Sequence, residues 1–367
     1  MSQTIPIADA AVSETALAAQ LGAESGSALE LEMHRGAKTP LRFAGKTQEL
    51  QGLLRGAGIF DLGYRTFLRA TGKDRVRWLN GMITQAVKTM TPGQVAYTLV
   101  LSPQGRIQGD GDVSFHEDAL FLETERSQAD RLLAHLRRFI IMDDVKLEGL
   151  DGARTALGIA GPRAGEILGK IGADVPEAGS FRAAKPAGVD GTVVQGYGPL
   201  VTHFELHVPA EQVLTVWKAL VAAGATPTGV EALHDLRVLE GVPEFDTDFS
   251  DKHLPQETNL DRALNFTKGC YIGQEIVERI RSRATVHRSL RQFELRGDAP
   301  KLGPGEKAEL RAGGAAVGEL TSTAAIELPG IEKKVALGMA RVEALEANEA
   351  LEYDGGTAVP LAAPPAL

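Results

Sequence analysis

Two stretches of the chain show the same order of hydrophobic and polar positions, about ninety residues apart. In the first, residues 66–70 have the pattern of a half-buried strand and residues 74–81 have helical spacing. In the second, a strand over residues 156–160 precedes a helix that includes Ile167 and Leu168. The pattern therefore predicts two units that each begin with a strand and a helix.

Each unit continues with strand-like runs and closes with an amphipathic helix. The runs cover residues 97–101 and 113–122 in the first unit and residues 192–208 in the second. Ser127 and Asp130 resemble a capping box at the start of the first closing helix. The apolar faces of the two closing helices contain Leu132, Leu136, Phe139 and Ile140, and Val213, Trp217 and Leu220. The order predicts an α+β fold with two pseudo-repeated antiparallel α/β subdomains.

From His287 onward, short alternating runs are separated by glycines and prolines. The clearest of these runs cover residues 290–295, 317–322 and 335–340. Short strands with frequent turn residues predict a small β-barrel. We therefore divide the chain into a partly flexible N-terminal extension (residues 1–50), two subdomains (51–150 and 151–285) and a C-terminal barrel (286–367).

The composition is that of an ordinary globular protein, with 43% hydrophobic and 24% charged residues among 367. A net charge of −9 argues against direct binding of nucleic acid. Residues 1–34 contain no lysine or arginine and five acidic residues, so neither a secretory signal nor a mitochondrial transit peptide is expected. Without a long apolar run for a membrane, we expect a cytoplasmic protein.

The single cysteine, Cys270, stands in the run Lys-Gly-Cys-Tyr-Ile-Gly-Gln-Glu at residues 268–275. Residues 265–267 are predicted as a short strand, and residues 274–280 as a helix. A thiol just ahead of a helix N-terminus, with Lys268 nearby, is expected to ionise more easily than a free one. The alternative is that Cys270 is buried as a small apolar residue.

This octapeptide resembles the signature of the YgfZ-type folate-binding proteins, a branch of the glycine-cleavage T-protein (aminomethyltransferase) superfamily. Residues 254–259 and 235–241 resemble further segments of that superfamily, and the likeness extends from about Gly58 to the last strands. The resemblance implies two subdomains and a barrel around a central channel, with tetrahydrofolate as cofactor. It also implies support of iron–sulfur cluster assembly or repair with assembly proteins as partners, and an indirect effect on tRNA modification. The alternative activity is that of a tetrahydrofolate-dependent aminomethyltransferase.

The resemblance also implies site residues. Cys270, Asp110 and Lys268 are the candidates for chemistry, with Cys270 facing the channel. The candidates for cofactor binding are Arg237, Tyr97, Gly269, Tyr271, Gly273, Gln274 and Glu275. No zinc or iron–sulfur site is expected within one chain, since a single cysteine and scattered histidines give no ligand spacing.

Two features depart from the aminomethyltransferase pattern. The first acid of a hairpin pair is replaced by Gly109, leaving Asp110, and residues 196–204 carry no acid for the pterin ring. Asp110 then either polarises an amine at the mouth of the channel or serves as a turn residue. Arg237 either contacts a ligand carboxylate or pairs with Asp235 or Glu240.

A basic cluster follows the octapeptide and comprises Arg279, Arg281, Arg283, His287, Arg288 and Arg291. It either attracts the glutamate tail of a folate or forms a solvated face. A third functional hypothesis is a folate-binding scaffold in which Cys270 is only structural.

Overall fold

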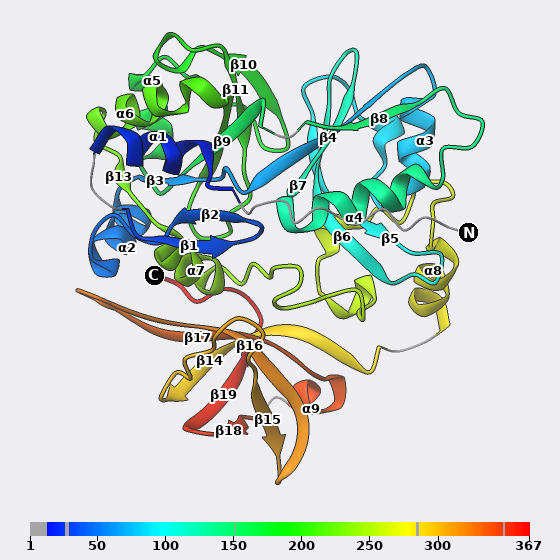
Figure 1. Cartoon of the computed structure of the whole chain (residues 1–367). Helices are drawn as coiled ribbons and strands as arrows, with labels where there is room; N and C mark the ends of the chain where they lie inside the picture. Colours follow the sequence, from blue (N-terminus) through cyan, green and yellow to red (C-terminus); the bar gives the residue numbers. More distant parts are fainter. Residues whose placement is uncertain (1–12, 26–28, 151, 284–285, 348) are drawn as a thin grey trace, which may run out of the picture.

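The structure, a computed structural model, describes residues 13–25, 29–150, 152–283, 286–347 and 349–367 (Figure 1). Of the predicted N-terminal extension, residues 1–12 and 26–28 lie outside the described residues. The rest forms α1 (Ala16–Ser25), a hairpin of β1 (Leu31–His34) and β2 (Ala37–Pro40), and α2 (Lys46–Arg55). Leu17 and Leu53 are completely buried, so this segment is packed into the core. The expected boundary at residue 50 falls inside α2.

The first subdomain is an antiparallel sheet covered by helices on one face. Its strands are β4 (Arg65–Thr71), β5 (Val95–Leu101), β6 (Ile107–Phe115), β7 (Leu120–Glu125) and β8 (Lys146–Gly149), in the order β5-β6-β7-β4-β8. Its helices are α3 (Arg75–Met82), the short 3-10 helix η1 (Val87–Thr89) and α4 (Arg126–Arg137). Trp78 of α3 and Leu132 and Leu136 of α4 pack on Leu68 and Val113 of the sheet. The run predicted at 113–122 is two strands joined by a turn, because β6 and β7 form a hairpin.

The start of α4 differs from the expected capping box. The N-cap residue is Glu125 and makes no side-chain cap; instead the Ser127 N–H donates to the carbonyl of Arg35 (3.1 Å). The β1–β2 hairpin thus supplies the partner that a capping side chain supplies elsewhere. The helix ends at Arg137, so Phe139 lies beyond it.

The second subdomain repeats the arrangement with one added feature. Its strands are β3 (Gly58–Asp61), β9 (Arg154–Ala160), β10 (Phe181–Ala184), β11 (Gly191–Gln195), β12 (His203–Pro209) and β13 (Thr226–Pro227), in the order β10-β11-β12-β9-β3-β13. The helices are α5 (Ala164–Lys170), η2 (Pro186–Gly188), η3 (Ala210–Gln212) and α6 (Val213–Ala222). Strand β3 precedes the first sheet in sequence but pairs with β9 of the second.

The C-terminal region is a closed barrel, as predicted. Its strands are β14 (Arg288–Gly297), β15 (Ala308–Ala312), β16 (Ala315–Leu328), β17 (Ile331–Arg341), β18 (Leu351–Tyr353) and β19 (Gly356–Leu361), with α9 (Val342–Glu346) at one end. The order β14-β17-β16-β15-β18-β19 closes because β14 pairs with both β17 and β19. Phe293 fills the interior and is completely buried.

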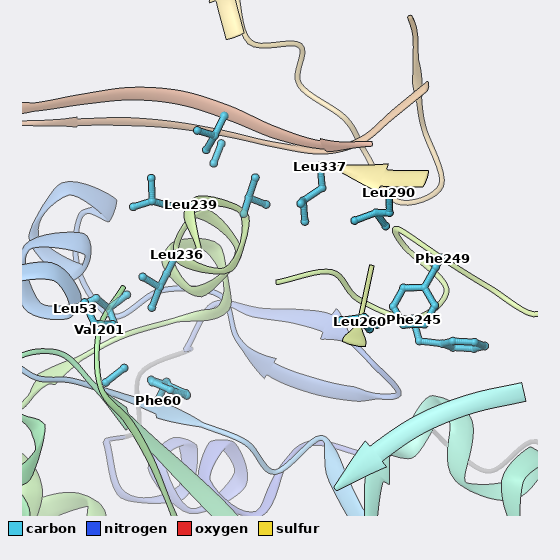
Figure 2. Close-up of a cluster of buried hydrophobic side chains, with 14 of the residues drawn as sticks. Leu53, Phe60, Val201, Leu236, Leu239, Phe245, Phe249, Leu260, Leu290 and Leu337 are labelled. Atoms are coloured by element: carbon cyan, nitrogen blue, oxygen red, sulfur yellow. The ribbon is translucent and has the colours of Figure 1, made fainter. Parts of the chain in front are cut away.

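Helix α7 (Val230–Leu239) joins the barrel to the two sheets. Figure 2 shows Leu236 and Leu239 of α7 between Phe60 on one side and Leu290 and Leu337 of the barrel on the other. Gln292 of β14 donates from Nε2 to the carbonyls of residues 238 and 239 (2.7 and 2.8 Å). These are end carbonyls of a helix, which have no partner within it, so the barrel caps α7 while packing on it.

The segment between α7 and the barrel contains η4 (Pro255–Glu257), η5 (Asp261–Ala263) and α8 (Gln274–Arg283). The helix expected at residues 274–280 is α8, which continues three residues further. The strand expected at residues 265–267 is wrong: the Asn265 side chain accepts the N–H groups of Thr267 (3.0 Å) and Lys268 (2.9 Å). Such a bond to the residues that follow fixes a turn, which outweighs the strand preference of Phe266 and Thr267.

Candidate functional site

A cavity of about 460 Å³ lies between the two sheets, the β1–β2 hairpin and α7. Its lining includes the carboxyl groups of Asp110, Asp112, Glu123, Glu125, Glu205, Glu240 and Glu244. The guanidinium groups of Arg35, Arg65, Arg237 and Arg262 also line it, and so do the rings of Phe60, Tyr64, Tyr97, Tyr197 and Phe204. Its volume is in the range of sites for small organic ligands.

Asp110 and Tyr97, both predicted as site residues, lie together in the cavity wall. The Tyr97 hydroxyl donates to Asp110 Oδ2 (2.5 Å), and Gln128 Nε2 donates to Oδ1 (2.9 Å). Burial raises the pKa of Asp110 and Glu125 adds to the rise, while the two hydrogen bonds oppose it. Asp110 lies in the middle of β6, so the alternative of a turn residue is wrong. A carboxyl group fixed in this way can accept an N–H group of a bound amine or hold a proton for it.

Arg237 lines the cavity, but its guanidinium is already bound within the protein. Nη1 donates to Asp248 (2.8 Å), Nη2 donates to Ser322 (2.7 Å), and Nε lies 2.6 Å from Glu244. The sequence-based alternatives Asp235 and Glu240 are not its partners. Arg237 therefore joins α7 to the barrel strand that carries Ser322, and a ligand carboxylate would have to displace Glu244 to reach it.

Four charged side chains connect the two sheets, and three of them, Arg65, Glu123 and Glu205, line the cavity. Arg65 of β4 lies 2.6 Å from Glu205 and 3.5 Å from Glu123, and His207 Nε2 lies 3.2 Å from Glu123. Burial lowers the pKa of His207, but the two glutamates outweigh this effect and raise it to about 9. Glu123, Glu205 and His207 offer ligand atoms within 4.8 Å of one another. However, Arg65 and the protonated His207 already balance the two carboxylates, so the group is an ion-pair network.

The pH dependence of stability is expected to report this network. Folded His207 keeps its proton up to about pH 9, whereas the unfolded chain releases it near 6.5. Protonated His207 therefore contributes on the order of 3 kcal/mol to the free energy of unfolding. This contribution is complete below pH 6.5 and is lost as the pH rises through 9. Urea unfolding at pH 6, 7.5 and 9 measures it. His207→Gln should cost most at pH 6 and least at pH 9; a cost that does not change with pH contradicts the prediction.

Sequence reasoning missed several cavity residues. Glu205 lines the cavity, and His207, which pairs with it outside the lining, lies two residues further along β12; period-two spacing directs both to the same face, so this signal was present. Glu205 directly follows the stretch that lacks an acid. No sequence signal identifies Arg35 or Arg262, because Arg35 reaches the cavity from a turn and Arg262 from the short 3-10 helix η5.

The octapeptide lies outside the cavity lining. Cys270 is exposed, so the alternative of a buried apolar cysteine is wrong, and it does not face the channel. Gly273 has a φ of +80°, and a Cβ there would lie 2.6 Å from the carbonyl oxygen of Ser102, so only glycine fits before α8. Gln274 and Glu275 form the first turn of α8.

Lys268 anchors the octapeptide. Its Nζ donates to the carbonyls of Asn80, Ile83 and Gln85, each at 2.6 Å, around the C-terminal end of α3. Burial lowers the pKa of Lys268 to about 7, and Lys88 adds to the effect. Three acceptors at this distance fit an ammonium group, which has three donors. Lys268 thus positions the loop of Cys270 instead of pointing at the thiol. Gly269 and Tyr271 flank the cysteine in the same loop, where the Tyr271 ring lies 4.8 Å from Lys268 Nζ.

The basic cluster is distributed over several contacts. Arg288 pairs with Glu257 (2.8 Å), Arg281 lies over the Phe266 ring (4.6 Å), and Arg291 donates to Ser289 (2.6 Å). The side chain of Arg283 lies outside the described residues. These contacts favour a solvated face over a single anion site.

Two sheets that enclose a central cavity, together with a C-terminal barrel, define a glycine-cleavage T-protein-like structure. The crystal structure of the glycine cleavage system aminomethyltransferase T from Bartonella henselae matches with a TM-score of 0.81 at 18% identity, over 93% of this chain and 94% of that one. Residues 15–268 match the family described as the GCVT N-terminal domain, and the chain belongs to this family. The predicted fold class is thereby confirmed.

Two relatives carry different names. An aminomethyltransferase of Nostoc sp. is 26% identical over 278 residues, which is 71% of each chain. A tRNA-modifying protein YgfZ of Yersinia enterocolitica is 29% identical over 243 residues, covering 62% of this chain and 68% of the relative. Within the described part of the chain, no helix combines the length and apolar character needed to cross a membrane.

Proposed function

We propose that the central cavity binds tetrahydrofolate. The observation that carries this proposal is the half-buried Asp110–Tyr97 pair in the wall of a cavity of about 460 Å³. A reduced pterin presents N–H groups, for which a fixed carboxyl group is an acceptor, and aromatic side chains provide surfaces for its ring. Membership of the GCVT family supports the same ligand class.

Binding is expected to weaken when the carboxyl group is replaced. Asp110→Asn keeps the shape but substitutes one acceptor oxygen by a donor, so affinity for tetrahydrofolate should fall about tenfold or more. Calorimetric titration of both proteins measures this. Asp190→Asn is the matched control, because Asp190 is exposed and, in the described part of the chain, forms an ion pair with Lys185 alone. Absence of saturable binding by the unaltered protein contradicts the proposal.

We further propose that the protein supports assembly or repair of iron–sulfur clusters and so affects tRNA modification indirectly. An exposed thiol outside the ligand cavity is accessible to another macromolecule, which supports a role of Cys270 toward an iron–sulfur assembly protein. The anchored position of the loop on α3 supports a fixed presentation of that thiol.

A one-carbon transferase is the second candidate, and the position of Asp110 inside the cavity favours it. This function requires transfer of a one-carbon unit from an aminomethyl donor to tetrahydrofolate, and Asp110→Asn should abolish it. Tetrahydrofolate binding without such turnover leaves the assembly role as the function.

A further inference from the structure

Arg262 is the one cavity arginine whose guanidinium has no carboxylate within ion-pair distance among the described residues. Arg35, Arg65 and Arg237 each pair with at least one glutamate. The Arg262 guanidinium carbon instead lies 3.8 Å from the ring centroid of Tyr97 and 4.0 Å from that of Tyr197. The two rings cover the flat faces of the group, and its N–H edge has no hydrogen-bond acceptor in the described chain. An unpaired guanidinium lining a cavity is suited to a negatively charged group of a ligand.

Arg262 also separates two compartments. A second pocket of about 290 Å³ lies against the barrel, and Arg262 lines both this pocket and the central cavity. Tyr197 and Glu240 are shared by the two linings as well. Glu240 is already engaged, since it accepts from the N–H groups of residues 200 and 201 and lies 3.1 Å from His203. Arg262 is therefore the charge that an elongated ligand meets between the compartments.

The backbone on both sides of Arg262 is bound to one turn of the first subdomain. Gln85 Nε2 donates to the Arg262 carbonyl (2.8 Å), and Thr84 Oγ1 donates to the Ala263 carbonyl (2.6 Å). The Asn265 N–H donates to the Thr84 carbonyl (3.1 Å). The backbone that follows Arg262 thus has little freedom to move independently of the Arg262 side chain.

The end of α3 and the same turn hold the other end of the segment. Lys268 binds the carbonyls of residues 80, 83 and 85, and the Ile272 N–H donates to the Gly81 carbonyl (3.0 Å). Cys270 lies between these two anchors. A change in the position of Arg262 is therefore expected to change the position of the Cys270 loop, because the short segment between them is hydrogen-bonded at both ends.

We propose that Arg262 receives the negatively charged group of the cavity's ligand and thereby fixes the segment that presents Cys270. The inference rests on the proposed binding of tetrahydrofolate, whose glutamate supplies the anionic group. The pterin of the ligand binds at Asp110, which accepts the hydroxyl of Tyr97. The glutamate carboxylate of the ligand binds the N–H edge of Arg262, whose guanidinium lies between the rings of Tyr97 and Tyr197. The ligand connects the two groups and restricts residues 262–272.

The test combines calorimetry with amide hydrogen exchange of residues 263–272. Tetrahydrofolate is compared with a tetrahydropterin that lacks the glutamate. Arg262→Gln should weaken tetrahydrofolate about 10- to 150-fold, the loss expected for a charge-assisted pair, and leave the tetrahydropterin unchanged. Tetrahydrofolate should slow exchange several-fold in the unaltered protein, but saturating tetrahydrofolate should not do so in Arg262→Gln. Arg262→Lys keeps the charge without the stacking, so it should retain part of the affinity.

Arg163→Gln is the matched control, because Arg163 is exposed, lies outside both pocket linings, and forms its one ion pair within the described residues with Glu166. Equal tetrahydrofolate affinity in the unaltered protein and Arg262→Gln overturns the inference, as does unaltered exchange on saturation, while folate binding then stands. Failure of the unaltered protein to bind either compound overturns the proposed function instead. In that case Arg262→Gln without ligand should still raise exchange about 5- to 30-fold, from the loss of two cation–π contacts, and unchanged exchange rejects the link to Cys270.

Discussion

Arg65→Met is expected to lower the free energy of unfolding by about 3–5 kcal/mol at pH 7, the usual cost of removing one partner of a buried ion pair. Arg65 is the cation that faces both Glu123 and Glu205; Glu123 is buried, and the Glu205 side chain is 14% exposed. Without Arg65 only His207 balances them. Methionine matches the length of the arginine stem, so the loss is mainly electrostatic. Urea unfolding followed by circular dichroism measures the change.

Arg69→Met provides the control on the same strand. Arg69 pairs with Asp118, whose side chain is 78% exposed, at 3.4 Å, and such exposed pairs contribute about 1 kcal/mol or less. The cost of Arg65→Met should also shrink toward pH 4, because protonation of the glutamates removes the unpaired charge. A cost below 1 kcal/mol, or one that is the same at pH 4 and pH 7, shows that the network does not hold the two sheets together.

Cys270→Ser is expected to remove the biological function without affecting the fold. The side chain is exposed, so the melting temperature should change by no more than about 2 °C. In cells that lack the protein, the activity of iron–sulfur enzymes and the level of tRNA modification should stay at the deletion level when Cys270→Ser is expressed. Binding of tetrahydrofolate should be unchanged, since Cys270 lies outside the cavity lining.

Thr267→Ala is the comparison for this experiment, because Thr267 is exposed in the same loop and three residues away. It should restore function like the unaltered protein. If Cys270→Ser restores function equally well, the thiol has no chemical role, and the scaffold hypothesis explains the protein better.

Periodicity, together with the resemblance to the T-protein superfamily, anticipated the architecture because most elements obey it. The barrel segment consists of short strand-like runs separated by turn residues, and α4 and α6 bury one stripe each, so the C-terminal barrel and the two α/β units follow from local pattern. Residues 265–267 were misassigned because a side-chain hydrogen bond from one asparagine decides the turn, and hydrophobic spacing does not register it. Assignment of β3 to the second sheet depends on pairing across a hundred residues, which no local pattern contains.

The site was less predictable than the fold. Asp110 and Tyr97 were found because the likeness of their hairpin to a known family pointed to them, whereas their hydrogen bond depends on strand register. Arg262 was missed because its partners, Tyr97 and Tyr197, come from other parts of the chain. The octapeptide was correctly recognised as a distinct feature, but sequence spacing contains no information on exposure, and Cys270 and Lys268 are directed away from the cavity.

The position of β3 has a consequence for the order of events during synthesis. Strand β3 leaves the ribosome before the whole first sheet, yet its partners β9 and β13 follow only after residues 154 and 226. The first sheet, whose strands all lie between residues 65 and 149, can form while β3 still lacks its partner strands. A nascent chain whose first 150 residues have left the ribosome should therefore contain one folded sheet and a protease-sensitive N-terminal segment, and protection of residues 58–61 should appear only when the second sheet has emerged.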